Sequence, residues 1–426
     1  MTVIFKLKTY LRPLQRQTIV FLLVASLWSF FTANSLAAET QTPSNTEIKG
    51  SLVIIGGALR PDNDEVWKRV VTQAGGAGAK FVVISAASAN PERSGKSAAA
   101  VLSRFGATAE VLPLSIKLKD TPYQEVVRDP NIIKLVSEAN GVYFTGGDQG
   151  RITKVLFQED GTRTPLLEAI WRMYQRGGVI AGSSAGAAIM SSTMFYDVPS
   201  SVLRTLKEGI RPGREIAPGL GFIGDQVFVD QHLIIRGRFA RMLPAMQKAN
   251  YKLGLGIDEN SAMVVSQQSL VEIIGYKGAI LIDLRDAQTD SSIKDFNISN
   301  AKIGYLDRGD QFDLRTKTLI PSADKIANKI DNDKPSGDEA VFTNDILGNT
   351  AAVDLMFRLL DNKQSKGMGL AFSDGKDARP DLGFAFTFTR TKDTVGYFST
   401  ASAEAYSAVN FRLDVRPIKV KLPIFK

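Results

Sequence analysis

Short apolar runs alternate with stretches of helical period over the N-terminal and central parts of the chain. Seven apolar runs lie at residues 52–55, 81–84, 111–114, 142–144, 179–181, 227–229 and 255–257. Stretches of helical period separate them, for example at 65–73, 97–105 and 165–176. Apolar runs without polar alternation are typical of strands buried on both faces. The pattern therefore predicts an α/β fold with a mostly parallel sheet covered by helices.

The pattern changes beyond residue 263. Runs at 270–274 and 279–284 are β-like, and residues 321–339 are rich in Asp, Lys, Ser and Pro, as in a linker. A helical period follows at 345–360, and alternation at 384–388 and 411–415 predicts two strands. We expect a main domain over residues 51–321 and an α+β extension over 322–426. The extension forms either a small unit of its own or extra strands on the main domain.

The first 38 residues show the three successive regions of a signal peptide. Four basic residues precede an apolar run at 18–31, and small residues at 36–38 offer a cleavage site. The apolar run is shorter than the about 20 residues that a bilayer span needs, so an uncleaved anchor is less favoured. We expect an exported protein, periplasmic or extracellular, with no membrane attachment after cleavage. Residues 39–50 are polar, which is typical of a mobile lead-in.

Composition narrows the chemistry. The chain has no cysteine and one histidine, His232. An exported chain of this kind has no disulfide and no cysteine nucleophile, and it lacks the ligands for a histidine-rich zinc or iron centre. Cleavage would remove four positive charges, so the formal net charge falls from +8 to +4. No basic stripe with interleaved aromatics accompanies this net charge, so no nucleic-acid partner is expected. No metal or cofactor is expected either.

Glycines follow three of the predicted strands, at 56–57, 146–147 and 182. In an open α/β sheet, ligands bind at the C-terminal ends of the strands. The first pair, Gly56 and Gly57, lacks the full glycine fingerprint of a dinucleotide site, so a Rossmann fold is the weaker interpretation.

The third glycine opens a Gly-x-Ser-x-Gly sequence, formed by Gly182, Ser184 and Gly186. A strand that turns at once into a helix leaves no room for Cβ atoms beside the turn, and the central residue is pushed out above the helix N-terminus. This spacing is that of a nucleophile elbow, and Ser184 is the candidate nucleophile. The alternative is a small-residue turn that only lets a helix pack closely on a sheet.

A serine hydroxyl needs a base to take its proton, and His232 is the one histidine that could serve. The alternative is a lone core or surface histidine. Polar residues surround it directly after an apolar strand, which is more typical of a site than of a core. These neighbours are Asp230, Gln231, Arg236, Arg238 and Arg241.

Gly146 and Gly147 lie between a predicted strand and a helix-like stretch. Two glycines let backbone N–H groups approach a ligand closely. We predict that the N–H groups of Gly147 and Ala185 bind the oxyanion, and that Gln149 points into the same cleft. The alternative is a plain turn in which Asp148 caps the next helix.

A histidine base also needs an acid that fixes its tautomer. Glu259 and Asp258 end a predicted strand, and Asp197 follows the elbow helix. The residues alone leave the choice among the three open, although an acid at a strand end is better placed.

Four separated motifs together resemble the cyanophycinase family, which is related to aspartyl dipeptidase (peptidase E). They are the elbow 182–187, the loop 146–149, the segment 230–241 with its histidine and three arginines, and the strand end 256–259. The order and spacing match over about residues 50–319. Leu233 and Ser183 stand where family members often have Phe and Thr. The signal peptide and long extension resemble the secreted members.

The resemblance implies a fold like class I glutamine amidotransferases, with a doubly wound, mostly parallel sheet. It also implies a Ser-His-Glu triad that maps onto Ser184, His232 and Glu259, and hydrolysis of cyanophycin to β-Asp-Arg dipeptides through an acyl-enzyme. The substrate contacts it implies are Gln149, Asp230, Gln231, Arg236, Arg238 and Arg241. Arginine forks suit the carboxylates of this polymer, and Asp230 suits its guanidinium groups. Members often form dimers, so a homodimer is an open expectation.

Two rival functions remain. A related peptidase could use the same machinery on short aspartyl or arginyl peptides. A non-catalytic polymer-binding protein is the second rival, and the joint presence of Ser184, His232 and Glu259 argues against it.

Overall fold

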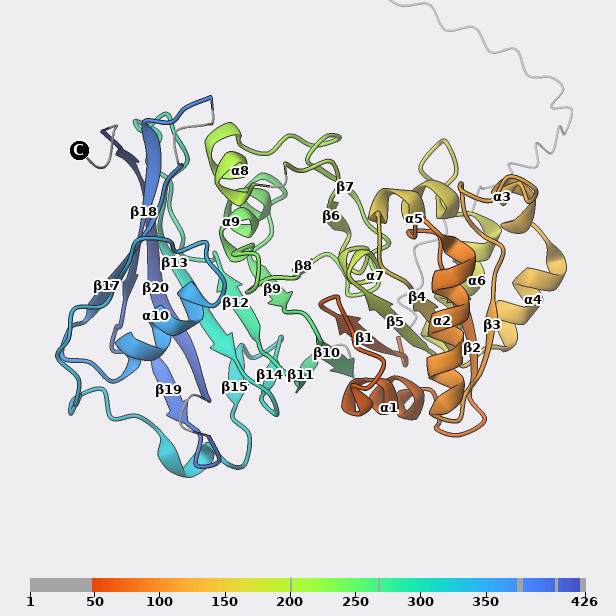
Figure 1. Cartoon of the computed structure of the whole chain (residues 1–426), viewed down its shortest axis with the longest axis horizontal. Helices are drawn as coiled ribbons and strands as arrows, with labels where there is room; N and C mark the ends of the chain where they lie inside the picture. Colours follow the sequence, from red (N-terminus) through yellow and green to blue (C-terminus); the bar gives the residue numbers. More distant parts are fainter. Residues whose placement is uncertain (1–47, 200, 267–268, 374–377, 403–404, 422–426) are drawn as a thin grey trace, which may run out of the picture. The chain divides into compact units, whose positions relative to one another are not determined.

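Two large sheets and the helices packed on them make up the part of the chain that the structure describes (Figure 1). This computed structural model describes residues 48–421, except 200, 267–268, 374–377 and 403–404. The predicted signal peptide and nearly all of the predicted lead-in lie outside the described residues. Within the described residues, no helix is long and apolar enough to cross a membrane.

The first sheet has nine strands within the described residues, in the order β15-β14-β11-β10-β1-β5-β4-β2-β3. Five neighbouring strands are parallel: β1 (Ser51–Ile55), β5 (Val179–Ser183), β4 (Gly141–Phe144), β2 (Lys80–Ile84) and β3 (Thr108–Val111). Four strands continue it in antiparallel pairing: β10 (Ser261–Ser266), β11 (Leu270–Gly275), β14 (Gln311–Asp313) and β15 (Thr318–Ile320). The predicted α/β class is confirmed, with a mixed sheet.

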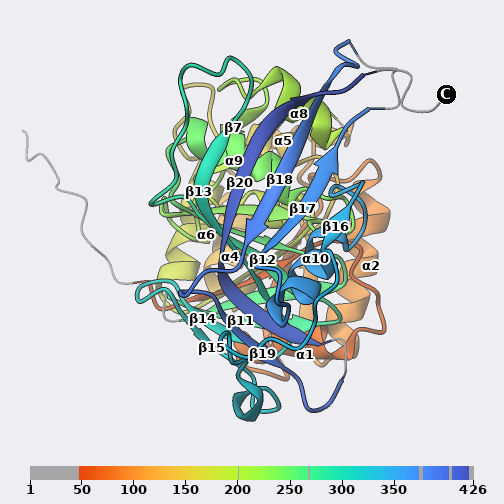
Figure 2. The same ribbon diagram turned by 90° about the vertical axis from the view of Figure 1, so that its left-hand side faces the viewer.

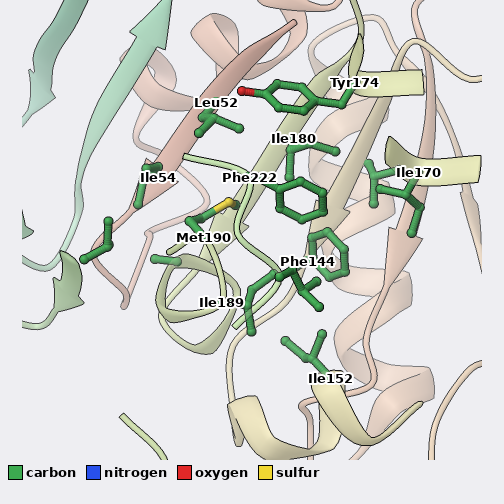
Figure 3. Packing of buried hydrophobic residues seen from close by; sticks show 14 of the residues in the cluster. Leu52, Ile54, Phe144, Ile152, Ile170, Tyr174, Ile180, Ile189, Met190 and Phe222 are labelled. Carbon is green, nitrogen blue, oxygen red and sulfur yellow. The ribbon is translucent and has the colours of Figure 1, made fainter. Parts of the chain in front are cut away.

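Helices cover both faces of the parallel strands, as the run pattern predicts. Alternate residues of β1 face opposite ways: Val53 and Ile55 belong to one apolar cluster, Leu52 and Ile54 to another. The first cluster includes residues of α1 (Asp64–Gln73) and α2 (Pro91–Arg104). The second includes residues of α4 (Pro130–Glu138), α5 (Gln149–Leu156) and α6 (Pro165–Gln175). Figure 3 shows this second cluster, in which Ile189 and Met190 below the elbow pack near Phe144 and Phe222.

Two of the strands predicted for the main parallel sheet belong to a second sheet instead. Residues 227–229 and 255–257 lie in β8 (Val227–Gln231) and β9 (Leu253–Ile257), which pair in parallel with each other. The apolar pattern placed both in the same sheet as the other runs. They start a second sheet instead, because the free edge of β1 is occupied by β10.

The strands after residue 322 extend the second sheet. Its order is β16-β17-β18-β20-β13-β12-β9-β8, and β19 pairs with β20 (Figure 2). The strands not yet given are β12 (Ala279–Asp283), β13 (Ile298–Leu306), β16 (Phe342–Thr343), β17 (Lys366–Ala371), β18 (Leu382–Thr389), β19 (Val395–Phe398) and β20 (Tyr406–Lys419). Of the two arrangements expected for the extension, the structure has the extra strands.

Buried phenylalanines show how this extension packs. In β18, Phe384, Phe386 and Phe388 are fully buried while the residues between them are partly exposed, the alternation of a sheet with one covered face. They share an apolar cluster with α9 (Phe239–Lys248) and α10 (Ala351–Leu360). The helix α10 begins at residue 351, six residues later than the helical period at 345–360 predicts. The backbone N–H of Ile346 instead donates to the carbonyl of Leu370 in β17.

The remaining described elements are short. They are α3 (Tyr123–Val126), α7 (Ala185–Ala188), α8 (Val202–Glu208), η1 (Ile326–Asn328), β6 (Thr193–Phe195) and β7 (Ile216–Pro218). The strands β6 and β7 form a separate two-stranded ribbon after the elbow helix.

Candidate active site

In the turn between β5 and α7, two glycines lie in close contact with other backbone atoms. Ser184 stands between them with φ 54° and ψ −106°, outside the usual regions for a side-chain-bearing residue. A Cβ on Gly182 would lie 2.3 Å from the carbonyl oxygen of Gly186, and one on Gly186 would lie 2.5 Å from that of Phe144. Only glycine fits either position. The turn therefore has the tight, strained geometry predicted for an elbow.

Three side chains from different elements form a hydrogen-bonded chain at this turn. Ser184 Oγ lies 2.8 Å from Nε2 of His232, and Nδ1 of His232 lies 2.5 Å from Oε1 of Glu259. His232 follows β8 and Glu259 follows β9, so the parallel pairing of these strands brings both residues to one edge. The candidate nucleophile contacts the candidate base, and the base contacts Glu259, the acid that the family resemblance implies.

Gly57, at the end of β1, lies against the imidazole ring of His232. It has φ +113°, and a Cβ there would lie 2.2 Å from Cε1 and 2.4 Å from Nε2 of the ring. The backbone N–H of His232 donates to the carbonyl of Gly56 at 2.8 Å. Sequence reasoning missed this role, because the glycine pair was weighed only as part of a dinucleotide site. The signal available was its place at a strand end.

The surroundings of His232 favour the neutral imidazole. Burial lowers its pKa most strongly, and the positive charges of Arg236 and Arg238 lower it further, while the hydrogen bond to Glu259 acts in the opposite direction. The net pKa lies below the ordinary value of 6.5. Burial raises the pKa of Glu259, but its hydrogen bond with His232 and the charge of Arg236 outweigh this and lower it. At neutral pH the pair is therefore a free base beside a carboxylate.

One predicted oxyanion donor, Ala185, belongs to the elbow, and the other, Gly147, belongs to the loop beside it. Ala185 is the first residue of α7, where a backbone N–H has no acceptor within the helix. In the neighbouring loop, a Cβ on Gly146 would lie 3.2 Å from Cβ of Ser184, so this loop passes directly beside the serine. Gly147 has φ +138°, and a Cβ there would lie 2.2 Å from the carbonyl oxygen of Ala87. Their role as oxyanion donors stays a prediction.

The two other acids considered for the triad have different surroundings. Asp258 is buried, and its Oδ1 accepts hydrogen bonds from the backbone N–H groups of Ile234 and Ile235. Its Oδ2 lies 3.3 Å from Nζ of Lys277. Asp197 is exposed and lines a hollow beside α5. Of the three candidates, Glu259 is the one that bonds to His232 among the described residues.

Asp230 and Arg241, two of the expected substrate contacts, bind each other. Two hydrogen bonds of 2.7 Å join the guanidinium to the carboxylate, and Arg241 and Asp230 are 5% and 1% exposed. The guanidinium also stacks over the ring of Phe195 at 4.1 Å. Both charges are satisfied and buried in this arrangement, and the contact of these two side chains with a substrate stays a prediction. They brace the segment that carries His232.

Of the other expected contacts, Arg236, Arg238 and Gln149 are at least partly exposed, whereas Gln231 is buried. Arg238 Nη1 donates to the backbone and side-chain oxygens of Gln231 at 2.9 and 3.0 Å. Burial and the nearby charge of Arg241 lower the pKa of Arg238 to about 10, which leaves it charged at neutral pH. Arg236 is half exposed and lies 3.4 Å from Glu259. Gln149 donates to the carbonyl of Phe195 at 2.7 Å. Among the described residues, no group of three or more metal-ligating side chains is present.

The family model of peptidase family S51 matches residues 52–273, just over half of the chain. The chain belongs to this peptidase family. It is therefore a serine peptidase, and the predicted cyanophycinase-like character is confirmed at the level of the family. The matched segment runs from β1 to β11 and contains every predicted site residue.

Curated relatives agree with this assignment. The cyanophycinase of Trichormus variabilis is 28% identical over 301 residues, which cover 68% of this chain and 93% of that protein. The cyanophycinase of Geminocystis herdmanii is 30% identical over 282 residues, covering 63% and 95%. A crystal structure of a peptidase from an acI-B1 Actinobacterium covers 63% of this chain and 98% of its own, with 21% identity and a TM-score of 0.43, which is too low to carry an argument.

Proposed function

We propose that this chain is an exported serine exopeptidase that hydrolyses cyanophycin to β-Asp-Arg dipeptides through an acyl-enzyme. The observation that carries the proposal is the hydrogen-bonded chain from Ser184 through His232 to Glu259. The substrate is that named for the two relatives described above, which this chain covers almost along their whole length. Export rests on residues 1–38, which lie outside the described residues.

The geometry supports a specific proton path. Nε2 of His232 is 2.8 Å from Ser184 Oγ and can take its proton as that oxygen attacks the aspartyl carbonyl carbon. The carbonyl oxygen becomes an oxyanion held by the N–H groups of Ala185 and Gly147. His232 then returns the proton to the leaving amine as the C–N bond breaks. Water hydrolyses the resulting ester by the same route in reverse. Glu259 holds Nδ1–H throughout and stabilises the imidazolium.

The charged groups left near the surface suit a substrate with carboxylates and guanidinium groups. Arg236 and Arg238 are available as forks for a carboxylate. Gln149 is partly exposed and adds a neutral amide, while Gln231 is buried and accepts a hydrogen bond from Arg238. Asp230 and Arg241 are not part of this set, because they neutralise each other.

The decisive experiment measures release of β-Asp-Arg from insoluble cyanophycin by residues 39–426. Wild type should clear the polymer. Ser184→Ala should lose at least about 10³-fold in rate, since the acyl-enzyme cannot form. Ser292→Ala, which removes an exposed hydroxyl from a loop, serves as the matched control.

Other results would select a rival function. Cleavage of short aspartyl or arginyl peptides without attack on the polymer would favour the dipeptidase alternative. Sedimentation with the granules without any cleavage would leave only a binding role. Export is tested separately, by determining the N-terminus of the protein secreted from a bacterial host, and a chain that keeps residues 1–38 would contradict it. A homodimer stays an expectation that light scattering can test.

A further inference from the structure

A groove runs from the candidate active site along α5. It consists of two hollows, of about 670 and 420 Å³, which share Gly150, Lys154 and Tyr196 as lining residues. The smaller hollow reaches Asp148, directly after the glycine pair beside Ser184. The larger one continues past Lys154 to Arg128 and Glu159. We call this surface the α5 groove.

The groove is connected to the elbow through direct contacts. The loop that leads into α5 passes so close to the elbow that a Cβ on Gly146 would lie 3.8 Å from Ser184 Oγ. The helix then lies against the ring of Tyr196, because a Cβ on Gly150 would lie 2.4 Å from its Cε2. Gln149 ties the start of the helix to the carbonyl of Phe195, the residue before Tyr196. A chain leaving the serine in this direction would enter the groove.

Asp148 and Arg151 pair with each other in the groove, whereas four other charges there are free to meet a ligand. Arg128, Lys154, Glu159 and Asp197 are exposed, and none has an ion pair within the residues that the structure describes. Tyr196 is 47% exposed, so part of its ring is accessible to a ligand. This contrasts with Asp230 and Arg241, which neutralise each other below the site. The accessible charges of both signs thus lie along α5.

We propose that the α5 groove binds further units of the polymer while the terminal unit is cleaved, an inference that rests on the proposed function. Lys154 and Arg128 bind the arginine carboxylates of these units, and Glu159 and Asp197 bind their guanidinium groups. Tyr196 offers a face on which a planar guanidinium stacks. The eight residues of α5 span roughly 12 Å at 1.5 Å each, the length of about three to four extended residues. The groove therefore holds several units rather than one.

The test compares a long substrate with the shortest one. We would measure kcat and KM for soluble cyanophycin chains and for a two-unit oligomer, with wild type and the double variant Lys154→Ala/Arg128→Ala. The control is Lys366→Ala/Lys419→Ala, which removes the same charge from exposed positions on the second sheet. Each lost surface pair is worth about 0.2–1 kcal/mol, so the double variant should lower the polymer-to-oligomer ratio of kcat/KM by about two- to thirtyfold. The loss should appear in KM, and it should shrink at high salt.

The aromatic contact has its own variants. Tyr196→Ala should lower the same ratio, and Tyr196→Phe should restore it, because the ring face remains. An unchanged ratio in both the charge variant and Tyr196→Ala would overturn the groove assignment while leaving the proposed function intact. A wild-type protein that cuts neither substrate would overturn the proposed function and the groove with it. Equal losses on polymer and oligomer would also refute the assignment, since they would indicate damage to the cleavage site itself.

Discussion

Gly57→Ala should disable the base of the triad while adding a single methyl group. The new Cβ would lie 2.2 Å from Cε1 of His232, 2.4 Å from Nε2 and 2.8 Å from Nδ1. Carbon atoms in ordinary contact are about 3.5–4.0 Å apart, so the ring has to withdraw by more than about 1 Å. Moving Nε2 that far from Ser184 lengthens their 2.8 Å separation beyond hydrogen-bond reach.

The expected cost to catalysis follows from the lost proton transfer. General base catalysis contributes about 10²–10⁴-fold, so kcat should fall by that factor. Alanine at φ +113° also strains the backbone, which costs about 1–3 kcal/mol of stability. The two effects need to be separated, because an unstable protein also loses activity.

Gly75→Ala is the matched control for the strain. Gly75 has φ +105°, close to that of Gly57, and a Cβ there would have no neighbour within 4 Å. We would measure dipeptide release and unfolding in urea for both variants. The backbone strain should cost both variants similar stability. Gly57→Ala should lose more than Gly75→Ala because of the added clash with the ring, and only Gly57→Ala should lose kcat.

A double-variant cycle isolates the contact with the ring even if the single variant folds poorly. In a His232→Ala background the imidazole is gone, so Gly57→Ala should cost only about as much stability as Gly75→Ala. A folded Gly57→Ala enzyme with kcat within about threefold of the Gly75→Ala enzyme would refute the positioning argument. An equal destabilisation by Gly57→Ala with and without the imidazole would refute the predicted clash.

Three further predictions concern the triad and the buried ion pair. Burial lowers the pKa of His232, and the base acts when neutral, so activity should fall as pH drops through a midpoint below 6.5; a kcat/KM profile with a midpoint above 6.5 would contradict this. Glu259→Gln removes a hydrogen bond and a charge that raise the pKa of His232, so the acid limb should move to lower pH while kcat falls about 10²–10⁴-fold. Retention of both the wild-type profile and rate would exclude Glu259 from the triad. Asp230→Ala should cost about 3–5 kcal/mol in urea unfolding, because it leaves Arg241 buried without its partner, and Asp230→Ala/Arg241→Met should recover much of it; a loss below about 1 kcal/mol would show that the pair is not structural.

Local chemistry explains which features of the protein its sequence reveals. A strand that turns sharply into a helix demands glycines at fixed spacing, so the elbow at 182–186 is visible in five residues. A single histidine leaves no choice of base, and the apolar runs predict buried strands wherever they occur. These signals predicted the α/β class and the family. They also singled out Ser184 and His232 but left the acid open among three residues, and the family resemblance implied Glu259. The structure joins Ser184, His232 and Glu259 in one hydrogen-bonded chain.

These local signals did not predict the order of the strands or the sheet to which each strand belongs. Residues 227–229 and 255–257 look like the other buried runs, because an apolar run shows that a strand is covered but not which neighbour it pairs with. The structure assigns them to a second sheet, together with strands from the extension. As a result, His232 and Glu259 follow two neighbouring strands of the second sheet, whereas Ser184 follows a strand of the first sheet.

Likewise, only the fold decided which charged side chains are buried in ion pairs and which are exposed. In the sequence, Asp230 and Arg241 look as free to bind a substrate as Arg236, since all lie around the end of the same strand. Folding buries the first two against each other and leaves Lys154 and Arg128 exposed along α5. The sequence by itself determined which reactive groups the chain carries, because residue types and local spacing are properties of the sequence. The tertiary structure decided which of them are neutralised and which face a ligand, because burial and long-range pairing join residues far apart in the chain.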